Sequence, residues 1–308
     1  MTGVAGERVS AVIVHYRTPA ETLRAAAAVA ATAPAAEIVV VDNASHDGIG
    51  PALARRVPAA RLLVEPSNRG YGAGCNRGAR ETVRPFLLLL NSDTAVAPGA
   101  VAALEAALDA DRRAAAAGPR LLNADGTLQP SIRRLPTPWR IFCESTGLAY
   151  LAGGRRPFEG HTATRQDHGS ARPVEALMGA ALLVRREAFD DVGGFDEAFF
   201  LYAEETDLMA RWAARKWRVL YEPAARVLHE GGRSGGDALF GHLHASLVRY
   251  ARKHHGPRAA RAAGLALDAG AALRYAAALL TPGEAGRRRR TRYAAALRRR
   301  AALAAPVR

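Results

Sequence analysis

The sequence predicts an α/β fold in which a mostly parallel sheet carries helices on both faces, and three observations predict it. Short apolar runs recur along the first half of the chain, and each has the length of a strand buried on both faces. Alanine-rich helical segments separate these runs, and the connections between them are short. Strands and helices that alternate in this way build a parallel sheet with right-handed crossovers.

The first half of the chain is expected to supply most of this sheet. Its central strand is Phe86 to Leu90, an apolar run bounded by Pro85 and by the polar triplet NSD. The other strands expected here are 9–14, 37–41, 61–64 and 115–122. The expected helices are 20–33, a poor helix ending at 57, a helix that follows the glycine-rich loop 68–78 and ends near 82, and 98–110.

The second half is less regular. Residues 126–172 carry several prolines and glycines, so we expect irregular structure there with a short helix at 139–151. Regular structure returns with a strand at 175–185, a helix at 204–216 and short strands at 218–221 and 226–228. From Asp237 onward the chain is expected to be helical, with interruptions at Gly256-Pro257 and Pro282-Gly283.

Size and charge limit the classes of protein that fit. The chain has 308 residues, enough for one large domain or two modest ones, and its net charge of +14 comes almost entirely from arginine. Such a charge favours anionic ligands or an anionic membrane face. Two cysteines without a CxxC motif exclude a disulfide framework and a zinc ribbon. The start does not resemble a signal peptide and no apolar run reaches about 18 residues, so a cytoplasmic protein without a transmembrane helix is expected.

Carboxylates follow two of the expected strands. Asp93 comes just after the strand 86–90, and Asp42 ends the strand 37–41. Ligands of open α/β sheets bind at this edge, where one carboxylate can hold a divalent cation and another can accept hydrogen bonds from a ribose or a base. For each aspartate, a turn-forming role is the alternative.

The glycine-rich segment 68–78 differs from a dinucleotide-binding fingerprint. A GxGxxG motif that starts at Gly72 would need glycine at position 77, which is Arg77, and the segment follows the third strand rather than the first. Its glycines either let backbone N–H groups approach a ligand at a helix N-terminus or serve only a tight turn.

The last candidates are acids and a histidine late in the chain. Glu204 and Asp207 fall on one helix face, with Glu205 turned another way. Clustered acids of this kind supply a general base or merely complement the helix dipole. His229 ends a strand, where it either completes a metal site with Asp93 or has a structural role.

The order of these motifs resembles the family 2 glycosyltransferases, in particular their rhamnosyltransferase-like branch. The resemblance covers about Val9 to Ser234, through the segments VSAVIVHY, IVVVDNASHDG, NRGYGAGCNRG, FLLLLNSDT, MGAALLVRREAFDDVGGFDEAFFLYAEETDLMAR and VLYEPAARVLHEGGRS. It implies a GT-A fold and an inverting sugar transfer from a nucleotide-diphosphate donor. The implied domains are a GT-A domain at 1–235, with a nucleotide-sugar-binding half at 1–125 and an acceptor and catalytic half at 126–235, and a C-terminal helical extension at 236–308.

The resemblance also implies roles for individual residues. Glu205 takes the position of the catalytic base with Glu204 beside it, and Asp93 and His229 are the metal ligands for Mg²⁺ or Mn²⁺. Asp42 is implied to bind the nucleobase. The full set implied for the nucleotide-sugar pocket is His15, Tyr16, Arg17, Asp42, Asn43, Asn68, Gly70, Tyr71, Asn76, Asn91, Ser92 and Asp93.

Two positions depart from the family pattern. Asn91 stands where the metal-binding motif usually has its first acid, and Glu205 stands where the family usually has aspartate. Which of Glu204 and Glu205 is the base therefore stays open. Arg211 continues the DLxxR pattern of the family and is expected to order the acidic segment.

The resemblance limits the classes of donor and acceptor without identifying either substrate. A dTDP-rhamnose donor is typical of the branch, and the acceptor is a glycan, a lipid-linked or a small-molecule hydroxyl, in cell wall or polysaccharide biosynthesis. The basic C-terminal helices, with arginines from Arg287 through Arg300, either pack as an extension or contact the inner face of the cell membrane peripherally.

Two other classes of protein are weighed against a transferase. A nucleic-acid binder would explain the charge, but no nucleic-acid-binding motif is present and aromatic content is only 6%, so no nucleic-acid partner is expected. A nucleotidyltransferase would need a basic, glycine-rich loop after the first strand, and HYRTPAE is not one.

Overall fold

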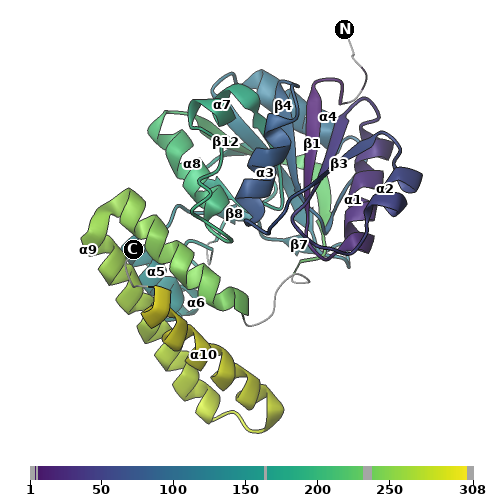
Figure 1. Cartoon of the computed structure of the whole chain (residues 1–308). Helices are drawn as coiled ribbons and strands as arrows, with labels where there is room; N and C mark the ends of the chain where they lie inside the picture. The colour runs from purple at the N-terminus through teal and green to yellow at the C-terminus, as the bar shows by residue number, and fades with distance from the viewer. Residues whose placement is uncertain (1–3, 5, 163–164, 232–237, 304–308) are drawn as a thin grey trace. The chain divides into compact units, whose positions relative to one another are not determined.

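The computed structural model describes residues 4, 6–162, 165–231 and 238–303, except for the side chains of 238–240, 292 and 295–303 (Figure 1). The chain forms two compact units. The first, here called the sheet unit, comprises Met1–Ile132, Asp167–Phe200 and Glu204–Ser234. The second, here called the helical unit, comprises Arg133–Gln166, Leu201–Ala203 and Gly235–Arg308.

The sheet unit is built on one mixed, mostly parallel sheet with the strand order β3-β2-β1-β4-β11-β6-β12-β5. Strands β3, β2, β1 and β4 pair in parallel, as do β6 and β12, whereas β11 and β5 run antiparallel to their neighbours. The predicted α/β fold is therefore confirmed. The strand bounds are β1 Val9–His15, β2 Glu37–Asp42, β3 Ala60–Val64, β4 Phe86–Asn91, β5 Thr94–Val96, β6 Ala114–Leu122, β11 Ala181–Arg185 and β12 Arg218–His229.

Four short strands complete the pairing. Strand β7 (Leu128–Gln129) pairs with β6, and β9 (Arg172–Val174) pairs with β12. Strands β8 (Ile132–Arg133) and β10 (Ala176–Leu177) form a separate two-stranded sheet. The expected single strand at 175–185 is thus divided into β10 and β11. The two strands expected at 218–221 and 226–228 are instead one strand, β12, with a register shift between Glu222 and Arg226.

Helices cover both faces of the sheet. One face packs against α1 (Pro19–Thr32), α2 (Gly50–Arg56) and α4 (Ala100–Ala110) in a core that includes Ile13, Leu88 and Leu104. The other face carries α3 (Tyr71–Arg80), which lies over β1 in Figure 1. The chain alternates its side chains between the two faces, as a strand buried on both sides requires.

Helix α3 corrects the expectation of a loop over 68–78, because only residues 68–70 precede the helix. A Cβ atom on Gly78 would lie 2.3 Å from Val12 Cγ1, and one on Gly74 would lie 2.8 Å from Val14 Cγ1. These glycines therefore allow α3 to pack closely on β1. Gly70 has a turn role instead, with φ 93°, and a Cβ there would lie 2.0 Å from the carbonyl oxygen of Phe200.

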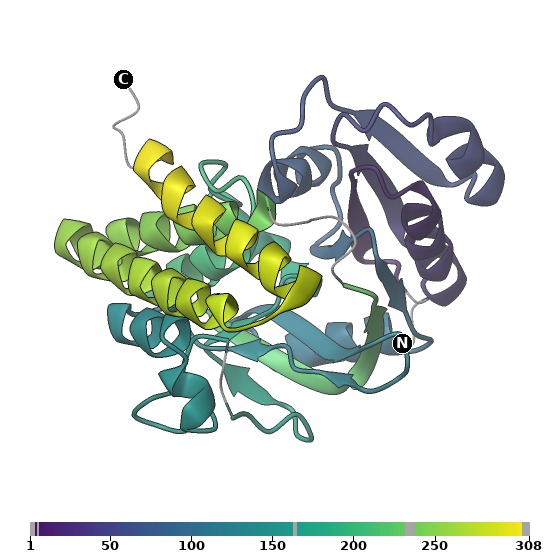
Figure 2. The ribbon, with the colours of Figure 1, turned by 90° about the horizontal axis from the view of Figure 1, so that it is seen from below.

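The helical unit consists of α5 (Pro138–Ser145), α6 (Leu148–Leu151), α9 (Ala238–Leu279) and α10 (Gly283–Leu303). Figure 2 shows α10 alongside α9, with which it makes many contacts. The interruption predicted at Gly256 is present as a kink with φ 86°. Among the described residues, no helix combines the length and the apolar character needed to cross a bilayer.

Residues 133–166 belong with the helical unit rather than with the expected catalytic half. Ile141 of α5 shares a small apolar core with Leu247 and Leu267 of α9, which explains the grouping. The predicted short helix over 139–151 is present as α5 and α6. The expected boundary between 235 and 236 lies outside the described residues, as do the side chains of Arg298 to Arg300.

Candidate active site

Three neighbouring strands bring polar side chains to one edge of the sheet. His15 ends β1 and pairs in register with Asp42, which ends β2. Asn91 ends β4 and pairs with Val14 on the other side of β1. Because parallel strands place their carboxyl ends together, this edge is the position at which open α/β sheets bind ligands.

A hydrogen-bonded turn lies beside this edge. The side-chain amide of Asn43 donates to Asn68 Oδ1 at 2.9 Å and to the carbonyl of Gly70 at 3.0 Å. Asn68 Oδ1 also accepts from the Gly70 backbone N–H at 2.9 Å. The structure therefore brings together Asn43, Asn68 and Gly70, and it holds the turn at the N-terminus of α3 in one conformation.

The segment after β1 is held in a similar way. The backbone N–H of Arg17, which has φ 55°, donates to Ser45 Oγ at 2.9 Å. The backbone N–H of Ser45 donates in turn to Asp42 Oδ1 at 2.8 Å. The guanidinium of Arg17 lies 5.2 Å from the ring centre of Tyr16. Non-glycine residues with positive φ carry strain, and such strain gathers at binding sites.

Ser92 is attached to the same segment, because its hydroxyl lies 2.8 Å from that of Thr18. Asn76 occupies a different environment. Its amide donates to the Phe195 carbonyl at 2.9 Å and to Glu197 at 3.0 Å, and its oxygen accepts from the Phe195 N–H at 2.9 Å. Through these bonds Asn76 fixes α3 to the turn at Phe195.

Asp93 and His229, the expected metal ligands, lie together. His229 Nε2 is 3.3 Å from Asp93 Oδ1, and each side chain is 10% exposed. Strand pairing explains this, because β12 aligns His229 with Thr94, the residue after Asp93. Burial would raise the pKa of Asp93, but the hydrogen bond and charge of His229, together with backbone hydrogen bonds from Asp93 and Gly231, hold that pKa below its usual value.

Gln129 orients the imidazole of His229. His229 Nδ1 lies 2.7 Å from Gln129 Oε1, while Gln129 Nε2 donates to Asn123 Oδ1 at 3.0 Å. A carbonyl oxygen only accepts, so Nδ1 carries the hydrogen and Nε2 faces Asp93. This is the arrangement in which histidine binds a metal, with its other nitrogen donating to a fixed acceptor.

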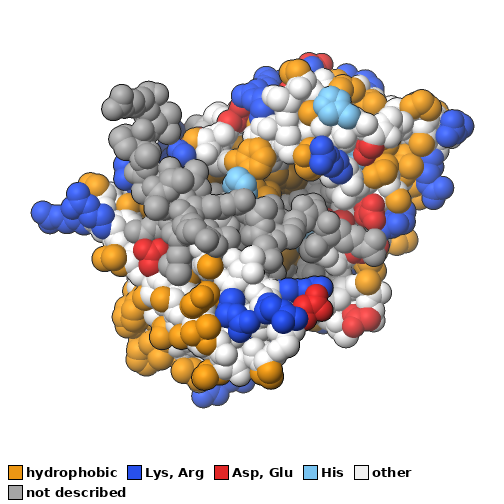
Figure 3. All heavy atoms as spheres, turned by 60° about the horizontal axis from the view of Figure 1, so that its bottom comes forward, with side chains coloured by type: hydrophobic (Ala, Val, Ile, Leu, Met, Phe, Trp, Pro, Cys, Tyr) orange, Lys and Arg blue, Asp and Glu red, His pale blue; other side chains and the backbone are white. Residues whose placement is uncertain are grey.

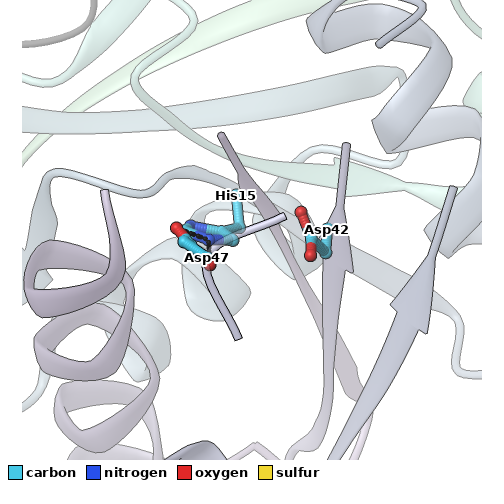
Figure 4. Close-up of side chains that lie close together, drawn as sticks. All are labelled: His15, Asp42 and Asp47. Carbon is cyan, nitrogen blue, oxygen red and sulfur yellow. Dashed lines mark hydrogen bonds and ion pairs between the residues drawn. The ribbon is translucent and has the colours of Figure 1, made fainter. Parts of the chain in front are cut away.

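A second cluster of metal-binding side chains lies at the nucleotide edge. Figure 4 shows His15 from the end of β1, Asp42 from the end of β2 and Asp47 from the loop that follows, with ligand atoms within 4.8 Å of one another. His15 Nε2 lies 3.0 Å from Asp47 Oδ2 and Nδ1 lies 2.7 Å from Thr22 Oγ1. Either an imidazolium–carboxylate ion pair or a shared cation satisfies this cluster.

The acidic pair begins helix α8 (Glu204–Ala214) in two different environments. Glu204 is 5% exposed, and its Oε2 atom has no hydrogen-bond partner among the residues that the structure describes. Burial, reinforced by the negative charge of Glu205, raises the pKa of Glu204 well above its usual value. Glu205 is more exposed and packs on Gly179, where a Cβ atom would lie 3.0 Å from the Glu205 Cβ. Glu204 is thus the carboxyl that favours its protonated form.

Tyr71 connects this pair to α3. Its hydroxyl donates to the Gly179 carbonyl at 3.3 Å. Burial raises the pKa of Tyr71 strongly, and the neighbouring Cys75, Glu204 and Glu205 raise it further. The side chain therefore stays a neutral phenol beside the acids.

Positive φ angles precede α8, and Arg211 restrains its first turns. The two residues before it, Tyr202 and Ala203, have φ 67° and 62°. Arg211 donates to Asp207 Oδ2 at 2.8 Å and to the Val192 carbonyl at 2.7 Å. Arg211 thus lies where the family pattern leads one to expect, on the acidic face of α8.

Sequence reasoning missed Gln129, Thr22 and Asp47. Gln129 comes from a segment without periodicity, so no signal in the sequence pointed to it. Asp47 was visible only as turn chemistry in SHDG. Each of these side chains contacts a histidine that the sequence analysis had already named. Gln129 contacts His229, and Thr22 and Asp47 contact His15.

Comparison with known proteins concerns the family and the fold of the chain. The family model described as "Glycosyl transferase family 2" matches residues 10–193. The chain is 35% identical over 246 residues to an N-acetylglucosaminyl-diphospho-decaprenol L-rhamnosyltransferase of Mycobacterium tuberculosis, which covers 73% of this chain and 78% of that protein. It is 25% identical over 215 residues to a low-salt glycan biosynthesis hexosyltransferase of Haloferax volcanii, covering 66% and 60% of the two chains.

Among solved structures, a mannosyltransferase from Pyrobaculum calidifontis in complex with GDP-Man and Mn²⁺ has a TM-score of 0.59 with this chain. The two are 20% identical, and the alignment covers 96% of this chain and 80% of the other. At this identity the likeness concerns the fold.

Proposed function

Because the chain belongs to the glycosyl transferase family 2, and is a glycosyltransferase with the GT-A fold, we propose that it transfers rhamnose from dTDP-rhamnose to a hydroxyl of a lipid-linked glycan. The rhamnosyl group and the diphospho-polyprenol acceptor are supported by the name of the mycobacterial relative. That acceptor would bring the enzyme to the inner face of the cell membrane, in the synthesis of a cell-wall or surface polysaccharide. Family membership favours a transferase over a nucleic-acid binder or a nucleotidyltransferase.

The observation that carries the proposal is the convergence of Asp93 and His229 at 3.3 Å. A carboxylate oxygen and an imidazole nitrogen that face each other suit a divalent cation such as Mn²⁺ or Mg²⁺. When bound, such a cation would neutralise charge that develops on the diphosphate leaving group. The competing position for a metal is the cluster of His15, Asp42 and Asp47.

At the nucleotide edge, the residues of the chain bind and orient the donor. Asp42 keeps one carboxylate oxygen on the Ser45 N–H, which fixes the orientation of its other oxygen. We assign that oxygen to a base N–H of the nucleotide. The turn held by Asn43 and Asn68 directs backbone groups at the start of α3 toward the donor.

Glu205 is the base that we assign to the reaction. An acceptor hydroxyl has a pKa far above neutrality and needs a positioned carboxylate to take its proton as it attacks the sugar. Glu205 is the more exposed acid, whereas Glu204 is buried and favours its neutral form. In-line attack from the side opposite the diphosphate would invert the anomeric centre.

A donor screen tests the proposal. Release of nucleoside diphosphate is followed with a panel of nucleotide sugars, each with and without a polyprenyl-diphosphate-linked N-acetylglucosamine acceptor. The expected result is acceptor-dependent release from dTDP-rhamnose, with a product whose anomeric configuration by NMR is opposite to that of the donor. Preference for another nucleotide sugar would overturn the donor assignment, and retained configuration would overturn the mechanism.

A further inference from the structure

The helical unit exposes a cluster of aromatic side chains. Trp139 is 47% exposed, Phe142 38% and Phe158 37%. Trp139 stacks on Phe142 with ring centres 5.5 Å apart, and it lies 6.1 Å from the ring of Phe158. Large aromatic rings are normally buried, so Trp139 in contact with two other exposed rings indicates an interaction site. We call Trp139, Phe142 and Phe158 the aromatic platform.

Further apolar side chains are exposed on the same unit. Tyr150 and Leu151 of α6 are 62% and 87% exposed, and α6 packs with α5, which carries Trp139 and Phe142. Figure 3 shows hydrophobic side chains gathered at the lower left of the view, over the helices of this unit. The exposed apolar surface therefore extends beyond the three rings.

The aromatic platform is held rigidly by its own segments. The indole N–H of Trp139 donates to the Pro157 carbonyl at 2.8 Å, which ties α5 to the segment that bears Phe158. The same two stretches are joined again where the Arg134 N–H donates to the His161 carbonyl at 2.9 Å. A surface that is already ordered loses little conformational entropy when it binds.

Positive charge lies beside the rings. The guanidinium groups of Arg134, Arg140 and Arg156 lie within 3.4 Å of the single buried carboxylate of Glu159. With three positive charges and one negative charge, this group has a net charge of +2. Arg155, next to Arg156, is exposed as well. The surface thus combines aromatic rings with cations, all carried by residues 134–159.

We propose that the aromatic platform, with Arg155 and Arg156, docks the protein on the interface of an anionic phospholipid bilayer. Tryptophan and other aromatic rings favour the headgroup level of a membrane, where one end of the ring is apolar and the other is polar. Arginines next to them gain energy from anionic lipid headgroups. This inference rests on the proposed function in one respect, since a lipid-linked acceptor would be met at such an interface.

The proposal differs from contact through the basic helix α10. Of its arginines, Arg288 is paired with Glu284 at 2.7 Å and Arg290 donates to the Ala278 carbonyl of α9 at 3.0 Å. Arginine alone would give binding that depends only on charge. The aromatic platform adds burial of apolar surface, which persists when salt screens the charges.

Vesicle binding of the full-length protein tests this assignment without sugar nucleotide or metal, so its result is independent of the proposed transfer. Vesicles of phosphatidylcholine with phosphatidylglycerol are compared with phosphatidylcholine alone. We expect Trp139→Ala with Phe158→Ala to weaken binding about tenfold, and Arg155→Gln to weaken it on anionic vesicles only. Val83→Ser, which removes an apolar side chain that is 85% exposed on the sheet unit, is the matched control and should bind like wild type.

Fluorescence quenching by brominated lipids locates the contact. Of the three tryptophans, Trp212 is fully buried and Trp217 belongs to the sheet unit, so the quenching that arises at the aromatic platform should be lost in Trp139→Phe, which keeps an aromatic ring. Wild-type binding in the Trp139→Ala, Phe158→Ala variant, or unchanged quenching in Trp139→Phe, would overturn the proposal. So would a dimer in solution that this double variant converts to a monomer, since the rings would then bind a second copy of the chain.

Discussion

At the scale of single residues, the direction of each hydrogen bond decides the role of the two site histidines. Gln129 accepts from one nitrogen of His229, and Thr22, whose own hydroxyl donates to the Thr18 carbonyl, accepts from one nitrogen of His15. The other nitrogen of each ring faces a carboxylate. The pair of His229 and Asp93 and the pair of His15 and Asp47 are thus two candidate sites for one predicted metal. Variants of each pair, tested separately, assign the metal to one of them.

The acidic pair gives a prediction about catalysis. Glu205→Gln should lower kcat by about 10²- to 10⁴-fold with little change in the KM of the donor, because it removes the proton acceptor and leaves the nucleotide edge intact. Glu204→Gln should lower kcat much less, since glutamine resembles the protonated acid. Steady-state kinetics of both variants decide between the acids, and an equal loss in the two would contradict separate roles.

The buried carboxyl of Glu204 gives a prediction about stability. Its pKa is raised in the folded protein, so the folded state holds a proton that the unfolded state releases. Its contribution to stability is therefore complete below the ordinary glutamate pKa, and it is lost as pH rises toward the folded pKa, by about 1.4 kcal/mol per pH unit between the two values. Urea unfolding at pH 5 and pH 8 should show wild type losing stability relative to Glu204→Gln.

The exposed Glu7 provides the control for this measurement, because Glu7→Gln should leave the difference from wild type unchanged between the two pH values. A constant difference for Glu204→Gln as well would mean that Glu204 is ionised in the folded protein at both pH values.

At the scale of elements, the glycines of 68–78 show what sequence patterns resolve and what they miss. The number of glycines indicated that the backbone of this segment closely approaches another group, but it did not identify that group. Only the structure shows that Gly74 and Gly78 approach the valines of β1, while Gly70 approaches Phe200. The glycine pattern fits a helix as well as a loop, because the residues that pack against these glycines lie far away in the sequence.

Gly70 and Gly99 both have positive φ, but they differ in ψ, which is 172° at Gly70 and −11° at Gly99, and in their surroundings. Among the described residues other than its chain neighbours, Gly99, with φ 79°, has no atom within 4 Å of an added Cβ, whereas Gly70, with φ 93°, has the Phe200 carbonyl oxygen at 2.0 Å. Gly99→Ala should cost about 1 kcal/mol of unfolding free energy, and Gly70→Ala about 3 kcal/mol or more. Chemical denaturation of both variants measures the difference, and equal costs would contradict the contact with Phe200.

At the scale of the whole chain, alternating apolar runs and helices predicted the sheet, because buried parallel strands carry a local signal. The prediction that Asp93 and His229 meet came from the resemblance, since their sequence separation leaves no local trace of the pairing between β12 and β5. The grouping of residues 133–166 with the C-terminal helices was missed for the same reason. Ile141 and Leu267 share a core that no periodicity connects.

The most direct test of the account is a Mn²⁺ titration in the presence of dTDP, followed by electron paramagnetic resonance. Asp93→Asn and His229→Ala should each weaken Mn²⁺ binding at least tenfold, and Asp47→Asn, which alters the competing cluster, should bind as wild type does. If Asp47→Asn abolishes binding while Asp93→Asn and His229→Ala leave it intact, the metal does not lie between Asp93 and His229, and the account is contradicted.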